Sequence, residues 1–165
     1  MKEKINWIWH YLSNNVVCQE CGKHERNYPD YICDAHTHGM NLYGHPEFQV
    51  VIDYGAKELG GLLNEMGRKV RDGQRFKHGD RVSGLYLDCD IELREMPDVN
   101  GQPILRMIIP DKQNRWPEAS DYPHNLQILA TSVLSLYGKI HENGEETDEE
   151  EYDECDVYPE EDYEN

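Results

Sequence analysis

Residues 48–72 read FQVVIDYGAKELGGLLNEMGRKVRD and contain the two elements that decide the fold. The apolar run FQVVI, rich in β-branched residues, predicts a buried strand over 48–52. Further on, three leucines, a methionine and a valine recur at the spacing of one helix face, which predicts an amphipathic helix over 56–72. Gly60, Gly61 and Gly67 weaken this helix, and we expect them to permit close packing on a sheet.

The segments on either side complete the predicted elements. Apolar residues at helical spacing predict a first helix over 3–13. Residues 84–95 alternate apolar and polar side chains, which is typical of a half-buried strand. The turn at 98–101 contains Asn-Gly, a strong hairpin signal, and 104–109 is the returning strand. The apolar segment 125–137 is a helix or a strand, because its periodicity does not decide between them.

This order of elements predicts one α+β domain with a mainly antiparallel sheet and one well-defined amphipathic helix packed on it. At 165 residues, one domain is the expected number. We expect an N-terminal helix and Cys-rich loop over 1–34, a core over 35–141 and an acidic tail over 142–165.

The negative charge is concentrated in the tail. The formal net charge is −17, yet residues 142–165 hold 14 acidic residues and no lysine or arginine, so the rest of the chain carries only −3. Mutual repulsion and few aliphatic residues predict a disordered tail. Such a tail keeps a protein soluble, or it docks on a basic protein or mimics nucleic acid through Tyr152, Tyr158 and Tyr163. The charge argues against direct binding of DNA or RNA, but a phosphate-bearing small ligand on the body stays possible.

The composition also bears on compartment. No apolar stretch reaches the length of a membrane span, and the first fifteen residues do not read as a secretory signal. The chain has five cysteines, an odd number, which favours a reduced cytoplasmic setting over a disulfide framework.

A cluster of cysteines and histidines predicts a structural zinc site. Cys18 and Cys21 form a C-x-x-C pair, and Cys33 and His36 form a C-x-x-H pair after eleven intervening residues. Two such pairs are the spacing that a tetrahedral zinc ion requires, with His24 as an alternative fourth ligand. The competing interpretations are that Cys33 is a small core residue on a strand, or that C-x-x-C is a redox pair.

The segment that follows is rich in histidine. Residues 31–40 predict an extended segment, on which His36 and His38 share one face because side chains alternate along a strand. Such a His-x-His pair is similar to the metal ligands of metallohydrolases. His45 is either a turn histidine bonded to the backbone or a third member of this group.

Several motifs occur in the order found in a known family. They are Ala35-His36-Thr37-His38-Gly39-Met40, Gly44-His45-Pro46-Glu47-Phe48, the helix 56–72 leading into Gly73-Gln74-Arg75-Phe76-Lys77-His78-Gly79-Asp80, then Pro110-Asp111-Lys112, Arg115-Trp116-Pro117 and Leu126-Gln127-Ile128-Leu129. Over about residues 35–129 the chain resembles the uncharacterised bacterial family catalogued as domain of unknown function 4262. The resemblance implies the architecture, and a bacterium or the bacterial host of a virus as the source, but no activity. The family has Tyr and Val where this chain has His36 and His38, so this strand is expected to act differently here.

From these residues we expect a binding protein for a small anionic or nucleotide-like ligand, with a structural zinc ion. The expected ligand site comprises His36, His38, His45, Glu47, Arg75, Asp80, Arg115 and Trp116. Arg75 and Arg115 would recognise phosphate or carboxylate, and Trp116 would stack on a ring, although an ion pair or core packing explains each equally well. The first alternative is a metal-dependent hydrolase that uses His36, His38 and His45 with Glu47 or Asp80. The second is an interaction protein that acts through its tail.

Overall fold

The structure is a computed structural model that describes residues 5–13, 28–140 and 156–159. Residues 137–140 and 156–159 are described by their backbone alone. Cys18, Cys21, His24 and the strand candidate at Val16 and Val17 lie outside the described residues, as does most of the acidic tail.

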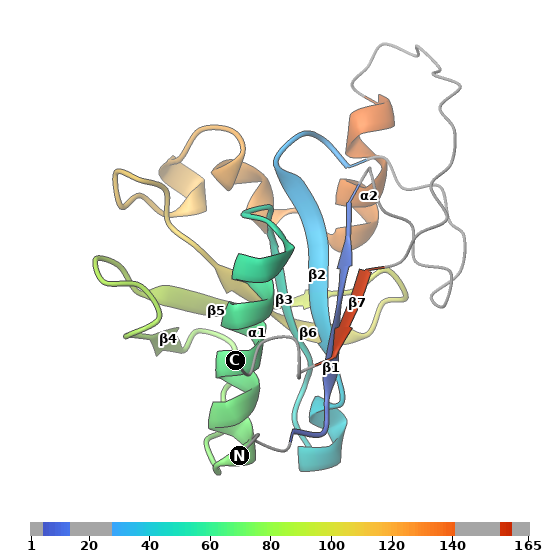
Figure 1. Ribbon diagram of the computed structural model, residues 1–165. Coiled ribbons are helices and arrows are strands. Elements are labelled where there is room, and N and C mark those ends of the chain that lie inside the picture. The colour runs from blue at the N-terminus through green and yellow to red at the C-terminus, as the bar shows by residue number, and fades with distance from the viewer. Residues whose placement is uncertain (1–4, 14–27, 141–155, 160–165) are drawn as a thin grey trace.

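A seven-stranded sheet with the order β4-β5-β6-β3-β2-β1-β7 forms the centre of the fold (Figure 1). Its strands are β1 (Ile8–Leu12), β2 (Ile32–His38), β3 (Phe48–Ile52), β4 (Arg81–Val82), β5 (Ile91–Pro97), β6 (Pro103–Ile108) and β7 (Asp156–Pro159). Every neighbouring pair is antiparallel except β3 and β6. The expected α+β domain with a mainly antiparallel sheet is therefore confirmed.

Helix α1 (Ala56–Arg71) covers one face of the sheet. Leu59, Leu63, Met66 and Val70 point from it into the larger core cluster, as the spacing predicts. A Cβ added at Gly60 would lie 2.0 Å from the Trp9 ring, and one at Gly67 would lie 2.5 Å from the Trp7 ring. These two glycines thus allow α1 to lie directly on Trp7, which precedes β1, and on Trp9 within it. At Gly61 nothing lies within 4 Å, so the expected close packing is absent there.

The opposite face is covered by the 3₁₀ helix η3 (His124–Ile128) and by α2 (Thr131–Ile140). They settle the open assignment of 125–137 as helical. A smaller core cluster forms on this face from Tyr28, Ile32, Val51, Ile52, Leu126 and Leu134. Two short 3₁₀ helices, η1 (Met40–Tyr43) and η2 (Pro117–Ala119), lie in connections. The histidine site described below lies on the same face as η3 and α2.

The expected helix over 3–13 is wrong, because Ile8–Leu12 form β1 within the sheet. Trp7 and Trp9 pack into the larger core while His10 between them lies on the other face, which is the period-2 pattern of a strand. Side chains on both faces of β1 are largely buried, so apolar residues occur on each face. Taken together along the sequence, these residues also fit the spacing of one helix face. The boundary at residue 34 is also wrong, since it divides β2.

The strand expected over 84–95 is only half correct. Residues 84–90 form a loop, and β5 begins at Ile91. Leu87 is fully exposed, so the alternation at the start of this segment does not reflect a buried face. Two aspartates, Asp88 and Asp90, flank Cys89 and disfavour a strand there. The Asn-Gly turn and the returning strand β6 are confirmed.

Four residues of the acidic tail have a described backbone. Residues 156–159 form β7, which pairs with β1 at the edge of the sheet. Among the described residues, no helix has both the length and the hydropathy needed to cross a membrane.

Candidate metal centre

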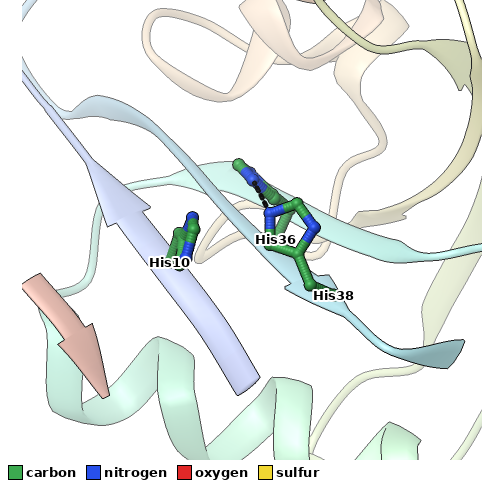
Figure 2. Close-up of side chains that lie close together, drawn as sticks. All are labelled: His10, His36 and His38. Atoms are coloured by element: carbon green, nitrogen blue, oxygen red, sulfur yellow. Dashed lines mark hydrogen bonds between the residues drawn. The ribbon is translucent and has the colours of Figure 1, made fainter. Parts of the chain in front are cut away.

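Pairing of β1 with β2 brings three histidines together on one face of the sheet. His10 of β1 lies directly opposite His36 of β2 in the antiparallel register. His38 follows two residues later on β2 and therefore points to the same side. Figure 2 shows the three rings converging from the two strands. We refer to His10, His36 and His38 as the histidine cluster.

The ring nitrogens of the cluster are close enough to share one ion. Their ligand atoms all lie within 4.8 Å of one another, and Nε2 of His36 lies 3.2 Å from Nε2 of His38. With Zn–N bonds of 2.0–2.1 Å, two nitrogens of a tetrahedral site are about 3.3 Å apart. The His36–His38 pair has this separation already.

Burial differs across the cluster. The His10 side chain is buried, with 5% of the residue exposed, whereas the His36 side chain is 15% exposed and His38 is exposed. An ion held by the three rings would therefore be shielded on the His10 side and would face solvent beside His38.

Asp34 orients His36. Its Oδ1 atom lies 2.9 Å from Nδ1 of His36, and the carboxylate side chain is only 5% exposed. A carboxylate accepts hydrogen bonds, so this contact favours the tautomer in which Nδ1 of His36 carries the proton. Nε2 of His36 is then left with its lone pair pointing at the cluster. A carboxylate behind a histidine ligand is the usual support of a protein metal site.

The local electrostatics favour the neutral forms of His10 and His38. Burial, followed by the nearby His38 and His36 rings, lowers the pKa of His10 from 6.5 to about 4. Burial and the His36 ring likewise lower the pKa of His38. Neutral imidazole is the form that binds a metal ion, so His10 and His38 are ready as ligands at neutral pH.

The two described members of the predicted zinc set, Cys33 and His36, do not lie together. Cys33 points into the larger core and is fully buried, with its Sγ atom 3.8 Å from the carbonyl oxygen of Val50. His36 lies on the opposite face of the same strand, so Cys33 and His36 cannot ligate one ion together. Burial also raises the pKa of the Cys33 thiol, which opposes the thiolate form that zinc requires. Pairing Cys33 with His36 was therefore wrong, and the core interpretation of Cys33 is correct.

His45 has a structural role. Its Nδ1 atom donates to the carbonyl oxygen of Pro46 at 2.7 Å, and its Nε2 atom accepts from the backbone N–H of Phe76 at 3.1 Å. Both ring nitrogens thus have hydrogen-bond partners, and the ring connects the backbone at Phe76 to the segment that precedes β3. The turn interpretation of His45 is correct, and its expected place beside His36 and His38 is not.

Glu47 also serves the backbone. Its carboxylate accepts from the Thr37 hydroxyl at 2.7 Å and from the N–H groups of Gly39 and Met40 at 3.1 and 3.2 Å. These contacts hold the turn that joins β2 to β3.

The remaining residues of the expected ligand site have local partners. Arg75 donates to the carbonyl oxygens of Val70 and Gln74 at the end of α1. Asp80 accepts from the backbone and side chain of Lys77, and Arg115 pairs with Asp111 at 2.8 Å. The Trp116 ring lies 4.8 Å from the Arg81 guanidinium. Arg75 therefore bonds backbone carbonyls rather than the acidic side chain expected as its alternative partner. Arg115 forms an ion pair, and Trp116 is half-buried against a neighbouring cation.

Two surface cavities lie elsewhere. One of about 850 Å³ and one of about 800 Å³ share Tyr54, Glu58 and Tyr86 between the start of α1 and the loop that precedes β5. None of the residues expected to bind a ligand lines either cavity. The sequence therefore did not predict this groove.

His10 is the member of the cluster that sequence reasoning missed. It was assigned to a helix, and only the alternation of Trp7, Trp9 and Tyr11 around it indicates a strand. Even with the strand recognised, the β1–β2 register is needed to place His10 opposite His36.

Comparison with protein-family models, with curated proteins and with solved structures finds no match for this chain. The resemblance over residues 35–129 therefore stays a prediction that rests on its motifs, and the function is argued from the site alone.

Proposed function

We propose that this protein binds one transition-metal ion, Zn²⁺ foremost, through His10, His36 and His38. The observation that carries the proposal is the convergence of three histidine ring nitrogens within 4.8 Å, with Asp34 bonded to the far nitrogen of His36. This is a different donor set from the cysteine-based zinc site expected from the sequence.

The donor chemistry supports the choice of metal. Imidazole suits zinc, copper, nickel and iron, whereas calcium and magnesium prefer oxygen ligands. Zinc accepts a tetrahedral arrangement without an electronic preference, which fits a site whose rings come from a rigid sheet.

A three-histidine site leaves a fourth position open. The exposed His38 lies at the solvent side of the cluster, so water or a small external anion is the ligand we propose there. An ion of charge +2 with three neutral ligands attracts anions. The small anionic ligand expected from the sequence would therefore bind at this ion and not beside Arg75 and Arg115.

Metal-dependent hydrolysis is the second candidate. Three protein ligands with an open position are the arrangement in which zinc activates water. In this candidate His10, rather than His45, joins His36 and His38, because both nitrogens of His45 are engaged by backbone groups.

Titration of the metal-free full chain with Co²⁺ and Zn²⁺ tests the proposal. We expect one ion per chain in the wild type, and loss of that ion in His36→Ala and His38→Ala. The matched control is His124→Gln, a half-buried histidine whose Nε2 lies 3.1 Å from the Tyr54 hydroxyl and outside the cluster.

A Cys18→Ser/Cys21→Ser double variant separates the two possible zinc sites. We expect it to retain the ion. Loss of the ion in this double variant, with retention in His36→Ala, would assign the metal to the cysteine pair and overturn the proposal.

A further inference from the structure

Arg106 on β6 is the most deeply buried charged residue near the cluster. It is fully buried, and burial lowers its pKa to about 10, so it stays protonated at neutral pH. Its guanidinium donates to the carbonyl oxygens of Gln127 and Leu129 at 2.7 and 2.6 Å and to the Thr131 hydroxyl at 3.0 Å. Its Nε atom donates to Oε1 of Gln49 at 2.8 Å.

The sheet register extends this contact to the histidine cluster. Arg106 lies beside Gln49 of β3, Gln49 lies beside His36 of β2, and His36 lies opposite His10 of β1. Nε2 of Gln49 is 2.9 Å from Oδ1 of Asp34, which in turn is 2.9 Å from Nδ1 of His36.

Arg106 determines the direction of the hydrogen bonds that link it through Gln49 to Asp34. A guanidinium has donors only, so the Gln49 atom facing it must be the amide oxygen. The Gln49 amide nitrogen therefore faces Asp34 and Thr131, with one hydrogen for each. Reversing the amide would set its oxygen against the Asp34 carboxylate and its nitrogen against Arg106 Nε–H, replacing two hydrogen bonds by two repulsions.

We propose that Arg106, acting through Gln49 and Asp34, fixes the tautomer of His36 with its proton on Nδ1. Gln49 and Asp34 are positioning residues. Gln49 holds the Asp34 carboxylate where it accepts the hydrogen bond from Nδ1 of His36. Nε2 of His36 then carries no proton before an ion binds. The value of this arrangement for metal binding rests on the proposed function, whereas the tautomer itself does not.

Nitrogen NMR of the ¹⁵N-labelled, metal-free full chain tests the inference at about pH 8, where histidine is neutral. Long-range proton–nitrogen correlations distinguish a protonated from a bare ring nitrogen. We expect His36 of the wild type to show protonated Nδ1 and bare Nε2. A wild-type His36 with its proton on Nε2 would overturn the inference.

Gln49→Met removes the amide while keeping a similar volume. We expect His36 to become a mixture of tautomers and the zinc dissociation constant to rise by about 10–100-fold. The matched control is Asn64→Leu, because the Asn64 amide is also buried but lies on α1, where it accepts from Nε1 of Trp7 at 2.8 Å and contacts none of these residues. The control should keep both the His36 tautomer and the zinc affinity.

Each remaining outcome is decisive. A single Nδ1–H tautomer that persists in a folded Gln49→Met variant would contradict the role of Gln49. Should that variant not fold, Asp34→Ala removes the acceptor next to His36, and persistence of the same tautomer there would contradict the inference. If His36 shows the expected tautomers but the wild type binds no zinc, this inference is sustained and the proposed function is refuted.

Discussion

Individual histidines of this chain differ in what their neighbours allow them to do. His45 donates from Nδ1 and accepts at Nε2, and both partners are backbone groups. His36 also donates from Nδ1, but to a carboxylate, and its Nε2 faces another histidine. A histidine side chain therefore links two backbone segments at position 45 and is a candidate metal ligand at position 36.

The His45 contacts predict how stability depends on pH. Burial lowers the folded-state pKa of His45 below 6.5, so below that pH the unfolded chain binds more protons than the folded one. The free energy of unfolding should therefore fall as the pH drops from about 6.5 towards the lowered folded-state pKa, because protonated Nε2 can no longer accept from Phe76.

Urea unfolding of metal-free His45→Gln between about pH 5 and 8 measures this effect. The variant should lose about 1 kcal/mol at pH 8 for its disturbed hydrogen bonds, yet show a shallower pH slope than the wild type. An unchanged slope would show that His45 does not contribute to it.

At the same scale, the sequence predicted part of the site. Alternation along a strand suffices to place His36 and His38 on one face, and this holds. The same alternation separates Cys33 from His36, which the C-x-x-H spacing by itself does not indicate. His10 was out of reach, because its proximity to His36 depends on pairing between β1 and β2.

Among the elements, α1 and β1 show how two glycines serve packing rather than flexibility. The helix follows its predicted face closely because its apolar residues meet a single core. Its N-terminal half lies so near Trp9 that no side chain fits at residue 60, while residue 61 faces open space.

Two adjacent substitutions in α1 test this contact. Gly60→Ala should destabilise the protein by about 1–3 kcal/mol, because its Cβ would overlap a rigid buried ring. Gly61→Ala should instead stabilise it by up to about 1 kcal/mol through helix propensity. Thermal and urea unfolding measure both, and equal effects of the two substitutions would contradict the packing described for Trp9.

Prediction of the elements failed where the apolar pattern of a segment fits more than one kind of structure. Residues 48–52 and 56–72 were assigned correctly because each has one dominant signal, a β-branched run or a clean helical face. β1 has apolar or aromatic residues towards both faces, and the resulting pattern also fits a helix. In the loop before β5, alternation persists without burial, as the exposed Leu87 demonstrates.

Across the whole molecule, the described part of the acidic tail lies at one edge of the sheet. The acidic tail accounts for most of the net charge of −17, and its strand β7 pairs with β1, the strand that carries His10. Docking of the tail on a basic protein stays a prediction. The histidine cluster does not depend on the tail for its ligands, since all three come from β1 and β2.

The most direct test of the account is zinc-edge X-ray absorption of the full chain loaded with one equivalent of Zn²⁺. We predict a first shell of three imidazole nitrogens and one further light atom at about 2.0–2.1 Å. A shell containing sulfur at about 2.3 Å would place the ion on cysteines and contradict the histidine site.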